Sequence, residues 1–455
     1  MKNSLSCFKL YDIRGKLGTE INDDLVYAVG RAIVRHFAAN TVAVGCDARL
    51  SSGSLKHALI SGIVNEGAKA INLGLTGTEE IYFASFCMDI DVGVEITASH
   101  NPIDYNGIKL IKRGGVPISA ENDLLQIKNI VSDSGFIYRK EVAPSESVNI
   151  TDSYVSHLLS YIELKNLQKM KIVVDSGNGV AGHVIDKIEE IFDSNNIPVK
   201  FIKINHEPDG TFPNGIPNPL IPENREITSR AVTEHKADLG IAWDGDFDRC
   251  FLFDENGVFI EGYYIVGLLA EAMLDKNKCG RIIHDPRLVW NTIDIVKRAG
   301  GIPVQSKTGH TYIKEAMRKE NAVYGGEMSA HHYFRDFAYC DSGMIPWLLV
   351  TQLMSRKKMK ISQMVAEMIK AYPVSGEINS VVDEPDVKIN ELYDKYKNDA
   401  ISVEFTDGLS MEFGNWRFNL RKSNTEPLLR LNVEARNDKS LLSEKTLMLL
   451  SEIRG

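Results

Sequence analysis

The chain has 455 residues, of which 44% are hydrophobic and 25% are charged, and its formal net charge is −9. This length is too great for one hydrophobic core and predicts three or four domains. The negative charge gives no global basic field, so we expect neither nucleic acid nor a membrane as a partner. An acidic protein that binds an anionic substrate needs locally placed cations or a metal ion.

The six cysteines are scattered and contain no C-x-x-C pair. This usage predicts reduced, mostly buried cysteines in a cytoplasmic protein. Residues 1–15 lack the continuous apolar segment of a secretory signal. The longest apolar runs, near residues 263–274 and 344–354, fall short of the roughly 20 residues that span a bilayer. We therefore expect a cytoplasmic location.

The first part of the chain alternates predicted helices and strands. After Tyr11-Asp-Ile-Arg-Gly15, the pattern predicts a helix, strand, helix, strand, helix and strand at residues 23–37, 41–45, 54–67, 70–73, 79–88 and 92–96. This alternation is typical of βαβ units in a parallel sheet. The last strand stops at Thr97-Ala-Ser-His-Asn-Pro102. Ser99 thus follows a buried strand, where α/β proteins place their ligands, although such a serine is more often a turn or cap residue.

Two strands of this module, each followed by a polar loop, have counterparts further along the chain. The first recurs at residues 171–179 and 281–287, and the second at residues 239–249 and 322–331. This repetition predicts three divergent α/β domains, each with a reactive loop at a strand end. Alternation at residues 416–420 and 428–433, followed by a final helix, predicts an antiparallel α+β domain with residues 421–427 as a turn.

The predicted fold class is therefore α/β, with three tandem mixed-sheet domains and a C-terminal α+β domain. We place the domain boundaries at residues 1–147, 148–253, 254–368 and 369–455. The Pro-rich residues 208–222 are interpreted as a surface loop inside the second domain.

The strongest local signal is Asp244-Gly-Asp-Phe-Asp-Arg249. Three carboxylates at alternate positions repel one another, and a divalent cation would relieve the repulsion. An EF-hand is excluded because Arg249 stands at the sixth position, which requires glycine, and because the flanks are strand-like. A Mg²⁺ ion held by three carboxylates would keep open positions for a phosphate oxygen. The alternative is an acidic hairpin turn that faces water.

Two further loops contain suitable donors and acceptors. Glu327 and Ser329 could hold neighbouring sugar hydroxyls, whereas the alternative is a Gly-rich turn with a capping serine. Residues 421–427 combine cations, hydroxyls, an amide and turn N–H groups, which suit a phosphate, although an ordinary polar hairpin is equally compatible. Arg14, Lys109 and residues 307–310 supply more cations, each of which could be an ordinary surface charge.

Taken together and in order, these motifs resemble one family. T-A-S-H-N-P, Y-N-G-I-K-L, D-G-D-F-D-R, G-E-M-S-x-H and R-x-S-N-T-E-P are similar to those of the α-D-phosphohexomutases, over essentially the whole chain. G-E-M-S resembles the phosphomannomutase/phosphoglucomutase branch, since the phosphoglucosamine branch typically has Gln in place of Met328. The Thr78-Glu-Glu80 and His284-Asp-Pro-Arg287 segments resemble bacterial members that supply GDP-mannose for surface polysaccharide. One departure is Arg287, where many relatives have lysine, so a point donor becomes a planar fork.

The resemblance implies an isomerase with its active site in a central cleft. It implies that Ser99 is a phosphoserine, and that Ser99, Asp244, Asp246 and Asp248 hold one Mg²⁺ per chain. A hexose 1,6-bisphosphate would be the intermediate and activator. The implied catalytic residues are Ser99, His100, Lys109 and Arg14. The implied substrate-binding residues are Tyr11, Arg249, Arg287, His310, Glu327, Ser329, His331, Arg421, Ser423, Asn424 and Thr425.

The implied reaction interconverts mannose 6-phosphate and mannose 1-phosphate. Phosphoglucomutase activity is the first alternative, a metal-dependent serine phosphatase the second, and a non-catalytic sugar-phosphate-binding protein the third. We expect small sugar phosphates as partners and a monomer or weak homodimer. A phosphate loop on a separate last domain further suggests a lid that excludes water.

Overall fold

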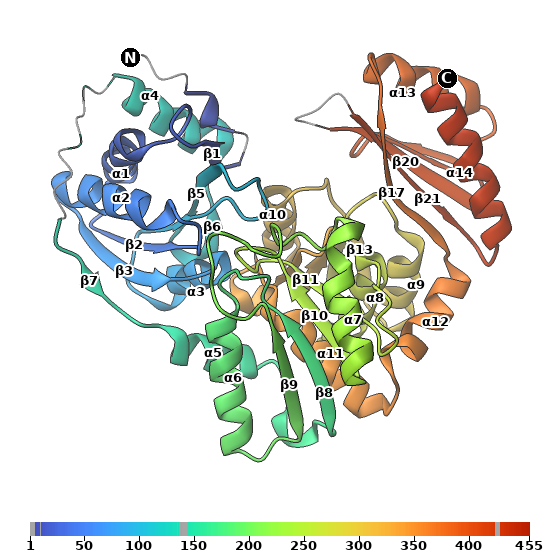
Figure 1. Ribbon diagram of the computed structural model, residues 1–455. Coiled ribbons are helices and arrows are strands. Elements are labelled where there is room, and N and C mark those ends of the chain that lie inside the picture. The colour runs from blue at the N-terminus through green and yellow to red at the C-terminus, as the bar shows by residue number, and fades with distance from the viewer. Residues whose placement is uncertain (1–4, 10, 134, 136–137, 139–142, 424–427) are drawn as a thin grey trace. The chain divides into compact units, whose positions relative to one another are not determined.

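The computed structural model describes residues 5–9, 11–133, 135, 138, 143–423 and 428–455 (Figure 1). The chain divides into two compact units. The first comprises Met1–Phe259 with Asp336–Lys357, and the second comprises Ile260–Arg335 with Lys358–Gly455. Residues 336–357, which the sequence assigns to the third domain, thus pack with the first unit. The predicted domain boundaries and the central cleft stay predictions.

The first sheet of the first unit has the strand order β1-β5-β4-β2-β3-β7, with β6 beside β5. β4, β2 and β3 are parallel, and β5 joins β4 in the antiparallel direction. The strands are β1 (Ile13–Lys16), β2 (Thr41–Cys46), β3 (Lys69–Leu75), β4 (Val92–Ile96), β5 (Tyr105–Lys112), β6 (Val116–Pro117) and β7 (Glu146–Ser147). The α-helices are α1 (Asp23–Phe37), α2 (Ser52–Asn65), α3 (Thr78–Cys87) and α4 (Leu125–Asp133).

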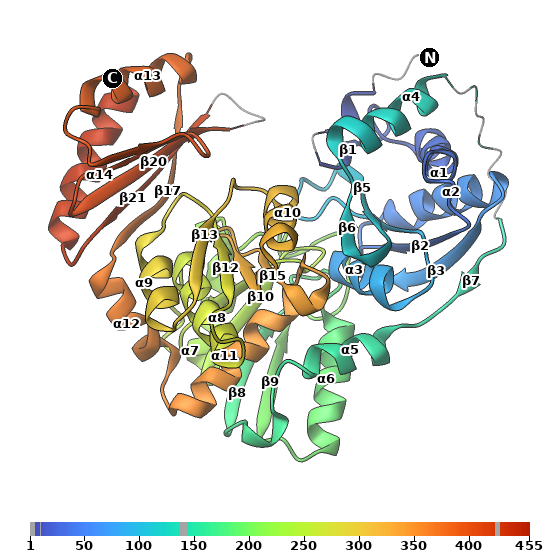
Figure 2. The same cartoon turned by 180° about the vertical axis from the view of Figure 1, so that it is seen from behind.

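The second sheet of the first unit has the order β11-β10-β8-β9. Its strands are β8 (Met170–Asp175), β9 (Val199–Ile204), β10 (Leu239–Trp243) and β11 (Cys250–Phe253), with helices α5 (Thr151–Leu159), α6 (Gly182–Ser194) and α7 (Glu226–His235). The segment that returns to the first unit contains β16 (Cys340–Asp341), which is not part of this sheet, and α11 (Met344–Lys357), which is labelled in the reverse view in Figure 2. The indole of Trp243 fixes this segment by donating a 2.9 Å hydrogen bond to the carbonyl of Gly343.

The second unit begins with a sheet in the order β13-β12-β14-β15. Its strands are β12 (Arg281–His284), β13 (Ile302–Gln305), β14 (Tyr324–Gly326) and β15 (His332–Phe334), and its helices are α8 (Gly262–Lys276), α9 (Trp290–Arg298) and α10 (His310–Glu320).

The predicted threefold pattern is present in the strand pairing. In each of the three sheets, the first strand of the module is parallel to the strand that precedes the reactive loop. In each, that second strand is followed by an antiparallel neighbour. The polar loops after β4, β10 and β14 are therefore equivalent parts of the repeated module. This arrangement confirms the predicted mixed-sheet α/β class.

The fourth sheet is antiparallel, in the order β17-β21-β20-β19-β18. Its strands are β17 (Val374–Val381), β18 (Ser402–Glu404), β19 (Leu409–Glu412), β20 (Trp416–Lys422) and β21 (Leu428–Ala435), with helices α12 (Ile361–Ala371), α13 (Pro385–Tyr396) and α14 (Lys439–Arg454). The predicted antiparallel pair and final helix are confirmed. The predicted turn was too long, because Arg421 and Lys422 continue β20 and pair with Arg430 and Leu429.

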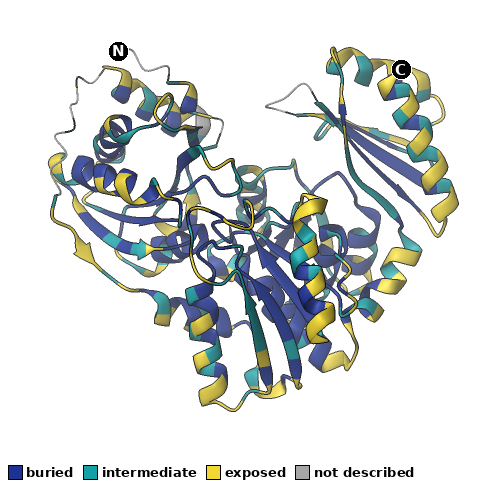
Figure 3. Ribbon diagram, in the orientation of Figure 1, coloured by how far each residue is buried: buried dark blue, intermediate teal, exposed yellow. Residues whose placement is uncertain are grey.

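The burial pattern explains why these segments form these elements. β2, β4, β8 and β10 are buried along nearly their whole length, as expected for central strands covered on both faces (Figure 3). α1 begins where the Asn22 side chain accepts the amide of Leu25 at 2.9 Å, and it ends at Ala38 in the left-handed conformation.

Four cysteines are buried, whereas Cys87 and Cys279 are exposed, and all six are free thiols. Among the described residues, none of the helices has the length and apolarity needed to cross a bilayer.

Helices α1 and α2 pack through glycine. A Cβ atom at Gly62 would lie 2.2 Å from the carbonyl oxygen of Tyr27, and one at Gly30 would lie 2.4 Å from that of Leu59. Both distances are shorter than any van der Waals contact, so the two backbones can approach this closely only without these side chains.

We predict that Gly62→Ala lowers the free energy of unfolding by about 1 to 3 kcal/mol, because the helices must separate to admit the methyl group. The matched control is Gly53→Ala in the same helix, where a Cβ meets no atom within 4 Å. This control should gain up to about 1 kcal/mol from helix propensity. Urea unfolding of both variants checks the prediction, and equal effects of the two substitutions would contradict it.

Candidate active site

Ser99 lies in the loop after β4, and only 3% of its surface is exposed. Its Oγ donates a hydrogen bond to Asp244 Oδ2 over 2.7 Å and lies 3.0 Å from His100 Nδ1. The backbone of Ser99 has a φ of +48°, in the left-handed region that costs a residue with a side chain about 1 kcal/mol or more. The loop therefore depends on contacts from outside its own sequence.

Arg49, in the loop after β2, provides these contacts. Its side chain is buried, and Asp47 Oδ2 lies 3.5 Å from its Nε. The sequence analysis assigned no role to Arg49. The one feature that could have indicated a role is the position of this arginine in the loop after a buried strand. Its terminal nitrogens donate to four backbone carbonyls, those of Ser99 (2.8 Å), Asn101 (2.6 Å), Pro102 (2.8 Å) and Tyr105 (3.0 Å).

The acidic loop after β10 brings its three aspartates together. One carboxylate oxygen from each of Asp244, Asp246 and Asp248 lies within 4.8 Å of the others, and all three residues are buried. Burial, followed by the neighbouring Asp248 and Asp246, raises the pKa of Asp244 well above its usual value. Asp246 Oδ1 is buried without a hydrogen-bond partner. A group of carboxylates with an unsatisfied buried oxygen fits a hard divalent cation.

Lys109, in β5, partly compensates this negative charge. Its ammonium donates to Asp246 Oδ2 and to Asp248 Oδ2, both at 2.6 Å. Burial lowers the pKa of Lys109, but the two carboxylates outweigh burial and the net direction is upward. Lys109 is therefore a permanent cation beside the acidic loop. Together with the Arg249 guanidinium, 3.8 Å from Asp244 Oδ2, it leaves the group of three carboxylates with excess negative charge.

Thr78, the first residue of α3, donates two hydrogen bonds to the acidic loop. Its Oγ1 donates to Asp246 Oδ2 at 2.6 Å, and its amide donates to the Asp246 carbonyl at 3.1 Å. The preceding Gly77 allows this approach, because a Cβ there would lie 2.1 Å from the ring of Phe247. The Glu80 carboxylate accepts the Gly77 amide at 2.9 Å. The sequence analysis used the Thr78-Glu-Glu80 segment only for its resemblance to a group of bacterial proteins. It did not predict the contact of Thr78 with Asp246.

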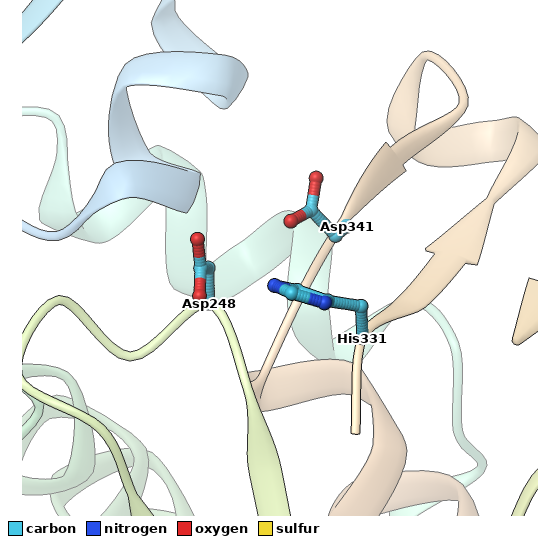
Figure 4. Close-up of side chains that lie close together, drawn as sticks. All are labelled: Asp248, His331 and Asp341. Carbon is cyan, nitrogen blue, oxygen red and sulfur yellow. The ribbon is translucent and has the colours of Figure 1, made fainter. Parts of the chain in front are cut away.

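Two other close approaches complete this part of the site. Gly245 lies against the Ser99 loop, because a Cβ at Gly245 would be 2.7 Å from the carbonyl oxygen of Ser99. Asp341, at the end of β16, brings a further buried carboxylate to within 4.8 Å of Asp248 (Figure 4). The acidic group is therefore larger than the motif that predicted it.

The remaining predicted cations of the first unit lie at the Ser99 loop. Arg14 donates to Asn101 Oδ1 at 2.6 Å and to the Ala98 carbonyl at 3.3 Å. Arg249 Nε lies 3.8 Å from Asp244 Oδ2. Burial, followed by Arg249 and Arg14, lowers the pKa of His100 well below its usual value. Tyr11 is half-buried and lies in the same opening segment as Arg14.

The predicted sugar-binding loop of the second unit is centred on Glu327, which is buried. Its carboxylate accepts the Gly309 amide at 3.0 Å and the Tyr333 hydroxyl at 2.6 Å, and its Oε2 lies 3.5 Å from His331 Nδ1. Burial raises the pKa of Glu327, but His331 and Arg287 lower it more, so the net direction is downward. Ser329 is half-buried in this loop, and His310 begins α10 directly after Gly309.

Arg287 and Arg421 share a carboxylate that sequence reasoning did not identify. Glu377, in β17, lies 3.1 Å from Arg421 Nη2 and 3.6 Å from Arg287 Nη1. Arg287 is also held by Asp285, at 2.8 Å. Ser423 follows β20, whereas the predicted Asn424 and Thr425 lie outside the described residues.

The fold, the side chains around Ser99 and the side chains around Glu327 define a multidomain α/β enzyme. Its buried serine lies beside an acidic loop. Comparison with known proteins identifies the family. Four Phosphoglucomutase/phosphomannomutase descriptions match in succession: alpha/beta/alpha domain I at residues 6–137, domain II at 152–257, domain III at 261–372 and the C-terminal domain at 377–447. The chain belongs to the phosphoglucomutase/phosphomannomutase family, as the motifs indicated.

Individual relatives agree with this assignment. The phosphomannomutase of Escherichia coli K12 is 54% identical over 449 residues, which are 98% of each chain. The solved structure of a phosphoglucomutase/phosphomannomutase family protein from Burkholderia thailandensis matches with a TM-score of 0.85 at 30% identity, over 98% of this chain and 97% of that chain. The structure of Aspergillus fumigatus N-acetylphosphoglucosamine mutase, in complex with GlcNAc-6P and magnesium, has the same fold. Its TM-score is 0.61 at 14% identity, over 98% of this chain and 95% of that chain.

We predict that Arg49→Met speeds amide hydrogen exchange in residues 97–106, because four buried carbonyls lose their donor. Hydrogen exchange followed by mass spectrometry measures the change. The control is Arg113→Met, which removes an exposed guanidinium that pairs with Asp89 and Asp91. Unchanged exchange in the Ser99 loop of Arg49→Met would contradict the assigned role.

The stability of the first unit should depend on pH through His183, in α6. His183 Nε2 lies 3.0 Å from Glu80 Oε1. Burial lowers the pKa of His183, but Glu80 outweighs burial and raises it above the ordinary value. A raised pKa means that the ion pair stabilises the fold fully below about pH 6.5 and less as the pH rises through the folded-state value.

We predict that the wild type loses free energy of unfolding between pH 6 and pH 8, and that His183→Gln loses less. Urea unfolding at both pH values tests this, with exposed His57→Gln as the control. An equal pH dependence in wild type and His183→Gln would contradict the assignment.

Proposed function

We propose that this chain interconverts mannose 6-phosphate and mannose 1-phosphate through a phosphoserine at Ser99. The observation that carries the proposal is the 2.7 Å contact between Ser99 Oγ and Asp244, inside a buried group of carboxylates and one ammonium. A buried hydroxyl at this position has little use in a protein that only binds sugar phosphates. Relatives that are 54% identical and named phosphomannomutase support mannose as the sugar.

The acidic group fits the Mg²⁺ ion that such a phosphoserine needs. A phosphate on Ser99 would place negative charge against Asp244, and a divalent cation removes this repulsion. Asp244, Asp246, Asp248 and the Ser99 phosphate are the proposed ligands, and the unpartnered Asp246 Oδ1 supports this set. When bound, the ion would act as a Lewis acid on the phosphoryl group. The magnesium complex of the Aspergillus relative supports the choice of metal.

The residues around Ser99 have proposed roles in stabilising the transferred group. Lys109 and Arg14 present cationic donors, and their charge offsets that of the phosphoryl oxygens. His100 Nδ1, 3.0 Å from Ser99 Oγ, is placed to exchange a proton with that oxygen. Arg49 holds the backbone of the loop and so positions Ser99 without touching the substrate.

The proposed reaction has two balanced halves. In the first, a sugar hydroxyl attacks phosphorus, the bond from phosphorus to Ser99 Oγ breaks, and the hydroxyl proton passes to Oγ, which leaves a hexose 1,6-bisphosphate. In the second, Ser99 Oγ attacks the other phosphorus, the bond from that phosphorus to the sugar oxygen breaks, and the Oγ proton passes to the sugar oxygen as the sugar monophosphate leaves. Because the intermediate must reverse its orientation in the site, the residues that bind the sugar must accept both orientations. Glu327, Ser329, His331 and Arg287 are the proposed sugar contacts, with Arg249, His310 and Tyr11 as further polar contacts.

The non-reacting phosphate needs its own site, for which Arg421 and Ser423 are the proposed contacts. Phosphoglucomutase activity is the second candidate function, since the matching family includes both activities. A metal-dependent serine phosphatase is less well supported, because it would need water where the mutase needs a sugar hydroxyl. We also propose a cytoplasmic location, a monomer or weak homodimer, and a place in GDP-mannose supply for surface polysaccharide.

We predict that Ser99→Ala abolishes conversion of mannose 1-phosphate to mannose 6-phosphate in the presence of Mg²⁺ and a hexose 1,6-bisphosphate activator. Without Oγ there is no atom to carry the phosphoryl group, so the loss should exceed about 10³-fold. The control is Ser54→Ala in α2, an exposed serine whose hydroxyl donates to the Asp23 carboxylate at 3.0 Å.

Two further measurements separate the alternatives. Intact mass should show one phosphate on the wild type, removed by hexose phosphate and absent from Ser99→Ala. Release of inorganic phosphate in proportion to turnover would replace the mutase with a phosphatase. The ratio of kcat/KM values for mannose 1-phosphate and glucose 1-phosphate decides the preferred sugar. Full activity of Ser99→Ala would contradict the proposed phosphoserine mechanism.

A further inference from the structure

The C-terminal sheet contains a buried ion pair, formed by Arg417 of β20 and Glu434 of β21. The two residues are paired across the strands, and they alternate with residues of the apolar core to which α13 and α14 contribute (Figure 1). Arg417 Nη1 lies 2.9 Å from Glu434 Oε1, and the exposed fractions of the two residues are 4% and 0%. A buried ion pair adds little stability, because the cost of removing both charges from water offsets their attraction. Their other partners therefore indicate what the pair does.

The guanidinium of Arg417 binds the backbone of the loop between β12 and α9. Its Nη1 donates to the carbonyl of Arg287 and its Nη2 to the carbonyl of Pro286, both at 3.0 Å. One side chain thus holds two consecutive peptide groups as well as Glu434. Because the donors of a guanidinium lie in one plane and in fixed directions, Arg417 sets the orientation of this backbone as well as its distance.

The carboxylate of Glu434 binds the residues that follow in the same segment. It accepts the amide of Val289 at 2.7 Å and the amide of Trp290 at 3.3 Å. α9 begins at Trp290, and the Val289 side chain at its N-cap accepts no hydrogen bond. The first amides of a helix have no acceptor inside the helix, and a carboxylate suits them in charge and geometry. Glu434 therefore caps α9 from the C-terminal domain.

Tyr263, in α8, completes this cap. Its hydroxyl donates to Glu434 Oε2 and accepts the Asn291 amide, both at 2.6 Å. Burial, followed by Glu434, raises the pKa of Tyr263 well above its usual value, so the hydroxyl keeps the proton that it donates. Arg417, Glu434 and Tyr263 together bind the backbone of five residues between positions 286 and 291.

The loop that these side chains hold contains Arg287, a proposed sugar contact. Asp285 Oδ2 lies 2.8 Å from Arg287 Nη2 and also accepts the Met328 amide at 2.9 Å. The guanidinium thus lies against the loop of Glu327, whose Oε1 is 3.8 Å from Arg287 Nη2. Arg287 Nε is buried and has no hydrogen-bond partner. Buried donors are nearly always satisfied, so an unused donor beside Glu327 suits an oxygen of the sugar.

The direction of Arg287 depends on its backbone more than that of a lysine would. The donors of a guanidinium are rigid, whereas an ammonium rotates at the end of a flexible stem. A small shift of the 286–291 segment would therefore misdirect Arg287. The side chains that hold this segment come from outside it.

We propose that Arg417 and Glu434 are positioning residues for the mutase reaction, which fix the backbone at Arg287 and so aim its guanidinium at the sugar. This inference rests on the proposed function and adds two residues that act through Arg287. Arg417 holds the peptide groups at Arg287 itself, and Glu434 holds the start of α9 just after them. The C-terminal domain thereby takes part in binding the sugar through the backbone of a loop in the preceding domain.

The test is a double-mutant cycle that combines Arg417→Met with Arg287→Met. Arg417→Met removes the contacts to both carbonyls and to Glu434, and we expect kcat/KM for mannose 1-phosphate to fall about 10- to 100-fold. In the Arg287→Met background no guanidinium is left to misdirect, so Arg417→Met should lower kcat/KM less than about 3-fold further. An equal loss in the two backgrounds would overturn the proposal, and so would an unchanged kcat/KM in Arg417→Met alone.

The matched control is Arg454→Met, which removes an exposed arginine from the same domain. Arg454, in α14, donates to Ser380 Oγ at 3.0 Å, and its replacement should leave kcat/KM at the wild-type value. Glu434→Gln keeps the shape of the cap but loses its charge, so it should lower kcat/KM by a smaller factor than Arg417→Met. If Arg417→Met does not fold, Glu434→Gln in the two backgrounds decides by the same criteria.

Hydrogen exchange followed by mass spectrometry separates this proposal from the proposed function. In Arg417→Met the amides of residues 286–291 should exchange faster than in the wild type and in Arg454→Met, because their backbone has lost its donor. If the wild type does not interconvert the mannose phosphates, the proposed function fails, and faster exchange still assigns the holding of this segment to Arg417. If the wild type is active and exchange in Arg417→Met is unchanged, the positioning role fails and the proposed function stands.

Discussion

The interaction on which the first unit depends is the contact of Ser99 Oγ with Asp244, inside a buried group of carboxylates. Burying several negative charges is expensive unless cations and donors compensate them. Lys109 and Thr78 supply part of this compensation from two other elements of the first domain. The loop after β4 and the loop after β10 therefore cannot be considered separately, because each carries charges or donors that the other needs.

The sequence identified the Ser99 loop and the acidic loop as candidates because each pattern is local. Three carboxylates in six residues, or a serine after a buried strand, are visible without a structure. Arg49 was missed because its partners are backbone carbonyls, which no side-chain pattern reveals. Thr78 was missed for a related reason, since its contact with Asp246 joins residues that are far apart in the chain. Prediction from sequence thus found side chains that the structure brings together, Ser99 and the three aspartates, more readily than the residues that hold their loops.

The C-terminal hairpin, formed by β20 and β21, also shows a limit of prediction from sequence. The predicted strand ended at residue 420 because the polar run that follows looked like a turn. In the structure β20 continues through Lys422, and Arg421 pairs with Arg430. Alternation predicted the apolar face of both strands correctly. It could not show that the polar residues between them face one another, because strand register is set by pairing and not by either strand alone.

The two units have opposite imbalances of charge. Beside Ser99, three aspartates and the nearby Asp341 face the Lys109 ammonium and the Arg249 guanidinium, so negative charge is in excess there. At the end of the pair formed by β20 and β21, the guanidiniums of Arg421 and Arg430 share the Glu377 carboxylate, so positive charge is in excess among the described residues there. Under the proposed function, a divalent cation would supply positive charge to the first group and a phosphate would supply negative charge to the second. The first group is buried and the second is half-buried, so both imbalances are costlier than they would be in water, the first more so. On this reasoning, the charges that these groups leave uncompensated favour the phosphate ester and divalent cation of the proposed function.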